Sequence, residues 1–126
     1  MYEVENPRRT VAVVDDDASL RRSLGRLLNA YGFQANEYAS AEAFLSRDPK
    51  TTIDCLVLDI DLGGMSGIDL QRRLTAEGTT LPVIFITALE TGSAKAQAEK
   101  AGCVAYLQKQ FSGATLIAAI NKALGL

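Results

Sequence analysis

The chain has 126 residues, of which 48% are hydrophobic and 22% are charged, which is typical of one globular domain with a sizeable core. A net charge of −2 and a pI near 5.1, without a run of basic residues, argue against direct binding of nucleic acid. The absence of histidine excludes Ser-His-Asp hydrolysis, histidine general-base chemistry and a role as a phosphohistidine carrier.

Short apolar runs alternate with amphipathic segments along the first half of the chain, as in repeated strand–helix units. The spacing predicts a first strand over Val11–Val14, followed by a helix that Asp17 or its neighbour caps. That helix ends near Gly32, because glycine is a common C-terminal stop. A weaker strand over Phe33–Tyr38 leads to a short helix that opens at Ser40.

The second half of the chain continues the same alternation. Cys55–Leu58 is a continuous apolar strand, as expected when helices cover both faces of a sheet. Ser66, with an acid three residues later, begins a helix that Gly78 ends. The remaining elements are, in order, a strand at Val83–Ile86, a helix at about Ser93–Ala101, a strand at Val104–Leu107 and a helix carrying Leu116, Ile117, Ile120 and Leu124. We predict a loose tail over residues 1–9 and one α/β domain over residues 10–126.

Cysteine usage and hydropathy indicate a cytoplasmic protein. Cys55 and Cys103 stand beside apolar runs without the spacing of metal ligands, and we expect both to be buried, reduced thiols. The first ten residues lack the apolar core of a signal peptide. No apolar stretch approaches the ~20 residues of a membrane span, so we expect no membrane partner.

Polar side chains stand at the ends of four predicted strands, where a parallel α/β sheet opens onto its ligand crevice. They are Asp15, Asp16 and Asp17, then Asp59 and Asp61, then Thr87, and finally Lys109. Singly, each has a structural interpretation as a capping acid, a strand-end hydroxyl or a solvated charge. Clustered carboxylates favour a hard divalent cation such as Mg²⁺. Together the residues supply a metal clamp, a carboxylate nucleophile, a hydroxyl donor and a cation, which phosphoryl transfer needs.

With these residues in place, the chain resembles the receiver domain of two-component response regulators over nearly its whole length. The residues that carry the resemblance are Val13–Asp17, Leu58–Asp59 with Gly64–Gly67, Ile86–Ala88, and Tyr106–Lys109 followed by Phe111. The resemblance implies a CheY-like, flavodoxin-like fold. In it, a doubly wound five-stranded parallel sheet has the strand order 2-1-3-4-5 and carries five helices.

The resemblance also implies roles for the acids. Asp59 would accept a phosphoryl group from a sensor histidine kinase or a phosphotransfer protein. Mg²⁺ would be held by Asp15, Asp16 and Asp59 together with the backbone carbonyl of Asp61. Such a chain catalyses its own phosphorylation and dephosphorylation only, and it is not otherwise an enzyme.

A second group of residues would respond to the phosphoryl group in the family. Lys109 would pair with the phosphoryl oxygens, Thr87 would hydrogen-bond the group, and Tyr106 would rotate inward. The output surface would be the fourth helix, the fifth strand and the fifth helix. It would serve a partner protein or a second copy of the chain as a homodimer, without direct nucleic acid binding.

The sequence departs from the family pattern at the loops around the site. Gln110 replaces a common proline, and because a non-proline cis bond costs about 2.5–4 kcal/mol, we predict a trans Lys109–Gln110 bond. Gly63 also replaces a common proline and leaves its loop freer. Asp61 and Leu89 lie where the family has the path of an attacking water, which predicts an altered phosphoryl lifetime.

Two alternatives remain at this point. Leu56–Asp61 also looks like the Asp-x-Asp motif of haloacid-dehalogenase-type phosphatases, with Asp59 as nucleophile and Asp61 as general acid/base. That family places the motif near its N-terminus and needs a later acidic pair, whereas no acidic pair follows Lys109 here. The other alternative is a degenerate receiver that acts as a docking module, against which the full set of site residues argues.

Overall fold

The computed structural model describes residues 8–88 and 92–126 and contains one five-stranded parallel sheet. Its strand order is β2-β1-β3-β4-β5, as predicted. The strands are β1 (Thr10–Val14), β2 (Gln34–Tyr38), β3 (Cys55–Asp59), β4 (Val83–Thr87) and β5 (Ala105–Gln108). The helices are α1 (Ala18–Ala30), α2 (Ala41–Leu45), α3 (Gly67–Ala76), α4 (Gly92–Lys100) and α5 (Gly113–Leu124). Each strand boundary lies within one residue of its predicted position.

Local side-chain caps lie at the starts of four helices, α1, α2, α3 and, through Ser112, α5. Asp17 Oδ1 accepts hydrogen bonds from two backbone N–H groups in the first turn of α1, at 2.9 and 3.2 Å. Ser40 and Ser66 each accept one such bond at the start of α2 and α3. Gly32 and Gly78 follow α1 and α3 with φ angles of 88° and 79°, a left-handed conformation that favours glycine. The predicted caps and stops are therefore confirmed.

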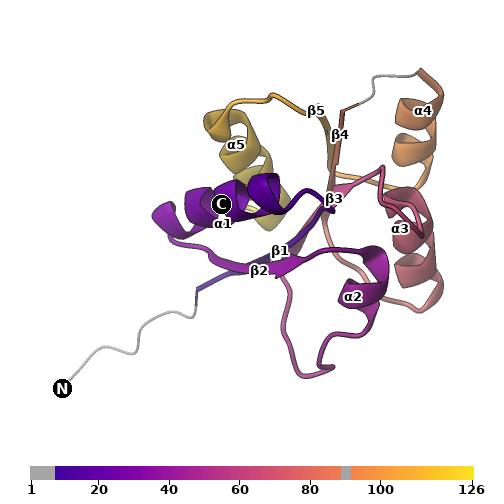
Figure 1. The fold of residues 1–126 in the computed structure, drawn as a ribbon, viewed down its shortest axis with the longest axis horizontal. Coiled ribbons are helices and arrows are strands. Elements are labelled where there is room, and N and C mark those ends of the chain that lie inside the picture. Colours follow the sequence, from indigo (N-terminus) through magenta and orange to yellow (C-terminus); the bar gives the residue numbers. More distant parts are fainter. Residues whose placement is uncertain (1–7, 89–91) are drawn as a thin grey trace.

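The helices cover both faces of the sheet (Figure 1). Alternate residues of β1 point to opposite faces, so Val11 and Val13 pack in the core beneath α1 and α5, whereas Ala12 and Val14 pack beneath α2, α3 and α4. All five residues of both β3 and β4 are buried. The continuous apolar runs thus have the two-sided burial that their composition predicted.

The topology places the carboxyl ends of β1 and β3 side by side. The two strands are hydrogen-bonded neighbours, although β2 follows β1 in the chain and lies on its other side. Such a switch in strand order opens a crevice at the carboxyl ends of the strands. Because β4 and β5 run parallel to β3, the residues after all four strands lie along the same edge.

Residues 1–7 of the predicted tail lie outside the described residues, and Arg8 is the first that the structure places. Its guanidinium donates hydrogen bonds to the backbone carbonyls of Gly32 and Phe33 and to Asn29 Oδ1. The Arg8 side chain therefore links the segment just before β1 to the end of α1 and to the turn that leads into β2.

The cysteines are free thiols in different environments. Cys55 is buried in β3, as predicted. Cys103 is only partly buried, which corrects the prediction for this residue, because it lies in the loop before β5 at the margin of the core. Across residues 8–88 and 92–126, no helix combines the length and apolarity that crossing a membrane requires.

Candidate functional site

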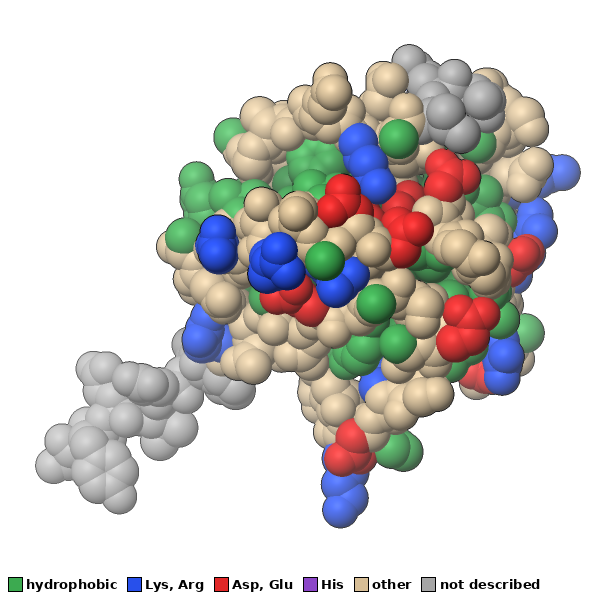
Figure 2. Space-filling model, viewed as in Figure 1, with side chains coloured by type: hydrophobic (Ala, Val, Ile, Leu, Met, Phe, Trp, Pro, Cys, Tyr) green, Lys and Arg blue, Asp and Glu red, His purple; other side chains and the backbone are tan. Residues whose placement is uncertain are grey.

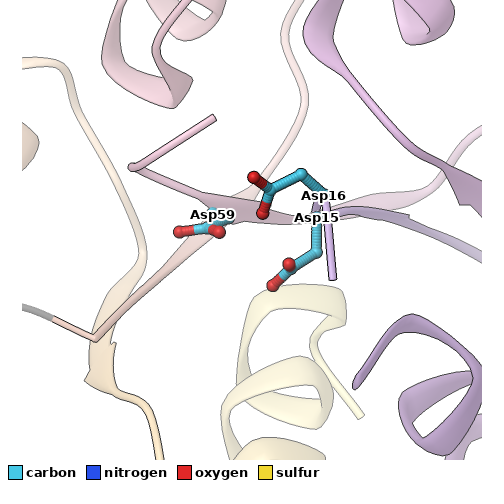
Figure 3. Close-up of side chains that lie close together, drawn as sticks. All are labelled: Asp15, Asp16 and Asp59. Atoms are coloured by element: carbon cyan, nitrogen blue, oxygen red, sulfur yellow. The ribbon is translucent and has the colours of Figure 1, made fainter. Parts of the chain in front are cut away.

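Three carboxylates meet where β1 and β3 end (Figure 3). One oxygen from each of Asp15, Asp16 and Asp59 lies within 4.8 Å of the others. Asp15 and Asp59 are buried, with 0% and 1% exposure, whereas Asp16 is exposed. Oδ2 of Asp15 is buried, and among the described residues its charged partner is Lys109. An oxygen-only cluster of three carboxylates with one open side fits a hard divalent cation such as Mg²⁺.

A lysine that directly follows β5 faces these acids. Lys109 Nζ donates a hydrogen bond of 3.0 Å to Asp59 Oδ2 and forms an ion pair of 3.1 Å with Asp15 Oδ2. Figure 2 shows acidic side chains gathered on this face of the molecule with Lys or Arg side chains beside them. One ammonium faces three carboxyl groups, so the cluster has more acidic than basic groups, and a bound cation would offset the difference.

Burial and charged contacts together set the pKa values of Asp59 and Lys109. It raises the pKa of Asp59 to about 6, against the lowering effect of the hydrogen bond from Lys109, while the charge of Asp15 adds to the rise. Burial lowers the pKa of Lys109, but its contacts with Asp59 and Asp15 outweigh burial and leave that pKa above its usual value. Near neutral pH, Asp59 is therefore an ionised carboxylate held at an electrostatic cost.

Hydrogen bonds link the loop after β1 to β2 and to α1. Asp15 Oδ1 accepts a 2.8 Å hydrogen bond from the backbone N–H of Asp17, and the N–H of Asp15 donates to the Tyr38 carbonyl of β2 at 3.2 Å. Arg21 of α1 donates to the Asp15 carbonyl at 2.8 Å. Asp17 itself caps α1 and does not join the metal cluster. Sequence reasoning missed Arg21, because nothing distinguishes it from other arginines on an amphipathic helix.

A glycine with no room for a side chain fixes the loop after β3. The N–H of Gly67, at the start of α3, donates a 3.0 Å hydrogen bond to the Ile60 carbonyl. A Cβ built on Gly67 would lie 2.2 Å from the backbone oxygen of Asp59. Glu42 of α2 accepts a 3.2 Å hydrogen bond from the N–H of Met65 in the same loop. The backbone at Asp59 is thus held by close contact with α3, and its loop is tied to α2.

Asp61 contacts two of the predicted site residues. Its N–H donates a 3.0 Å hydrogen bond to Asp59 Oδ1, and its Oδ2 accepts a 3.3 Å hydrogen bond from the hydroxyl of Thr87. Thr87 is buried at the end of β4, and its carbonyl accepts a hydrogen bond from the N–H of Lys109 at 2.6 Å. These contacts connect the ends of β3, β4 and β5.

The last predicted site residue lies on β5. Tyr106 is half-buried, pairs in register with Phe85 of β4 and packs against the core beneath α2, α3 and α4. No peptide bond among the described residues is cis, which confirms the predicted trans bond between Lys109 and Gln110. Gln110 has a φ of 75°, an uncommon conformation for a residue other than glycine. Leu89, predicted to affect the phosphoryl lifetime, lies outside the described residues.

Comparison with known proteins identifies relatives along almost the whole chain. The family model described as "Response regulator receiver domain" matches residues 11–121. Transcriptional regulatory protein TdiR of Thauera aromatica is 42% identical over 117 residues, which cover 93% of this chain and 52% of TdiR. Transcriptional regulatory protein FixJ of Azorhizobium caulinodans is 36% identical over 115 residues, which cover 91% of this chain and 54% of FixJ.

A solved structure agrees with these relatives. The crystal structure of FixJ-N is 35% identical and superposes with a TM-score of 0.86, covering 95% of this chain and 96% of that one. The chain spans about half the length of the TdiR and FixJ relatives that it matches. No comparison supports the phosphatase alternative.

Proposed function

We propose, because this chain belongs to the response regulator receiver family of two-component signalling, that Asp59 is the residue that accepts the phosphoryl group. The observation that carries the proposal is the environment of this carboxylate. Asp59 is buried at the end of β3, Lys109 lies 3.0 Å from its Oδ2, and two further acids complete a metal cluster around it. The complete set of residues also argues against a degenerate docking module.

In the proposed reaction, an oxygen of Asp59 attacks the phosphorus of the donor. A new O–P bond forms while the bond between phosphorus and the leaving atom breaks, and the leaving group keeps the electron pair. For the proposed donors, a sensor histidine kinase or a phosphotransfer protein, that atom is an imidazole nitrogen. Lys109 lies where its ammonium can pair with the phosphoryl oxygens.

The metal would be held by Asp15, Asp16 and Asp59, together with the backbone carbonyl of Asp61. When bound, Mg²⁺ would offset the negative charge of the phosphoryl oxygens and of the carboxylates. Arg21 acts on this site only indirectly, because its bond to the Asp15 carbonyl holds the loop that carries two of the acids.

The proposed output is a switch rather than a turnover reaction. Phosphorylation adds about two negative charges at the edge of the sheet, and Thr87 and Tyr106 would respond by shifting between two packings. The surface of α4, β5 and α5 would then bind a partner or a second copy of the chain. We propose that the chain catalyses only its own phosphorylation and dephosphorylation, and that it acts in the cytoplasm, where free thiols such as Cys55 persist.

Small-molecule phosphodonor labelling tests the acceptor. In Mg²⁺ the wild-type chain should gain one phosphoryl group, measured by intact-mass spectrometry, whereas Asp59→Asn should gain about 100-fold less because its amide is a poor nucleophile. Asp69→Asn is the matched control, since Asp69 is exposed on α3 and lies outside the metal cluster. Labelling of Asp59→Asn at the wild-type level would overturn the assignment, and continued phosphate release in excess of the chain would favour a phosphatase.

The metal ligands can be tested without phosphorylation. Asp16→Asn should weaken Mg²⁺ binding about tenfold or more, because it removes a charged ligand from the open side of the cluster. Calorimetric titration measures the affinity directly. Asp17→Asn provides the control, because asparagine also caps helices and Asp17 lies outside the cluster. Equal affinities for the two variants would contradict the proposed ligand set.

A further inference from the structure

The side chain of Asp61 forms a contact that the proposed reaction does not use. Its Oδ2 accepts the hydrogen bond of the Thr87 hydroxyl at 3.3 Å, while its backbone N–H holds Asp59 Oδ1 at 3.0 Å. One residue therefore links the acceptor on β3 with the switch threonine on β4. Asp61 is exposed, so its carboxylate can move outward into solvent without breaking packed core contacts.

The carboxylate of Asp61 and a phosphoryl group on Asp59 would compete for the single hydrogen bond that the Thr87 hydroxyl can donate. A threonine hydroxyl has a single hydrogen to donate, and both an ionised carboxylate and a phosphoryl oxygen are strong acceptors. If Thr87 turns toward a phosphoryl group on Asp59, it must leave the carboxylate of Asp61. The phosphoryl group would also repel that carboxylate, which is attached two residues from the acceptor.

We propose that Asp61 is a positioning residue that holds Thr87 in its unphosphorylated conformation, and that phosphorylation acts partly by displacing this carboxylate. The inference rests on the proposed function of Asp59 and Thr87. Asp61 opposes the phosphorylated conformation through both its hydrogen-bond acceptor and its charge. Removing both should therefore favour that conformation more than removing the charge alone.

Beryllofluoride, a phosphoryl mimic, provides the test in saturating Mg²⁺. Asp61→Ala should bind it about threefold to tenfold more tightly than the wild type, which corresponds to about 0.7–1.4 kcal/mol. Asp61→Asn keeps an acceptor without the charge and should fall between them. Both variants keep the backbone N–H and carbonyl of residue 61. Asp69→Ala, which removes an exposed acid on α3, should bind as the wild type does.

Two further measurements separate a local effect on Thr87 from a general one. Without beryllofluoride, the methyl resonance of Thr87 should shift in Asp61→Ala toward its position in the beryllofluoride complex. In a Thr87→Val background, Asp61→Ala should lose the part of its effect that acts through the hydroxyl, so its gain should fall to less than half.

The outcomes distinguish this inference from the proposed function. If the wild type does not bind beryllofluoride, the proposed function fails. If the wild type binds but Asp61→Ala binds equally or more weakly, only the inference about Asp61 is wrong. An undiminished gain in the Thr87→Val background would also overturn it, because the effect would then be independent of the hydroxyl.

Discussion

Gly67→Ala is expected to destabilise the domain by about 3 kcal/mol or more, at the upper end of the cost of overpacking. The new Cβ would lie 2.2 Å from the backbone oxygen of Asp59 and 3.1 Å from the Cα of Ile60. Backbone atoms cannot rotate away, so either α3 or the end of β3 must shift. Helix propensity alone predicts the opposite sign, because alanine is favoured over glycine within helices by about 1 kcal/mol. Urea denaturation measures the difference.

Gly63→Ala is the matched control for this prediction. No atom lies within 4 Å of a Cβ built on Gly63, and its φ lies outside the left-handed range. Its free energy of unfolding should stay within about 0.5 kcal/mol of the wild-type value or rise slightly. Equal stabilities for the two alanine variants would show that the contact between Gly67 and Asp59 does not constrain the loop.

Asp59→Asn is expected to stabilise the metal-free protein by about 1–3 kcal/mol near pH 7.5, although it abolishes the proposed acceptor. The pKa of Asp59 is about 6 in the folded chain, against an ordinary value of 3.8. Between these values the folded state binds more protons than the unfolded state, so stability falls as pH rises from about 4 to 6 and stays lower above. Asparagine does not ionise, its one oxygen can still accept from either Lys109 or the N–H of Asp61, and Lys109 keeps its ion pair with Asp15.

The pH dependence is the sharpest part of this prediction. Urea denaturation in EDTA should give a large gain for Asp59→Asn near pH 7.5 and little or none near pH 4. Mg²⁺ should then reduce the difference at pH 7.5, because a bound cation favours the ionised wild-type cluster. Asp69→Asn, at an exposed site, should show no such profile. A gain of the same size at both pH values would exclude ionisation of Asp59 as its cause.

Local patterns in the sequence determined most of the framework. Continuous apolar runs such as Leu56–Leu58 predicted strands buried on both faces. Successive side chains of a strand point to opposite faces, so an unbroken apolar run by itself indicates that both faces are covered. Caps such as Asp17 predicted helix starts, because each acts within one turn. The strand order rested on family resemblance, since no local pattern specifies which strands become neighbours.

Polar residues after the strands indicated one site, because parallel strands bring their carboxyl ends to the same edge. The tertiary structure decided which of those residues join the metal cluster and which make other contacts. Asp17 caps α1. The side chain of Asp61, whose contacts the sequence did not specify, accepts a hydrogen bond from Thr87. Arg21 holds the carbonyl of Asp15 from a helix whose pattern singles out no residue.

The space available around Gly63 and Gly67 was likewise decided by the tertiary structure. The sequence contains Gly63 in a loop and Gly67 at a predicted helix start, and no local pattern shows which of the two approaches other backbone atoms. Only packing α3 against the end of β3 reveals that one has open space and the other touches the acceptor backbone. Periodicity and caps depend on neighbours along the chain, and so the sequence alone determined them. Contacts between loops depend on distances between packed elements, which exist only in the folded molecule.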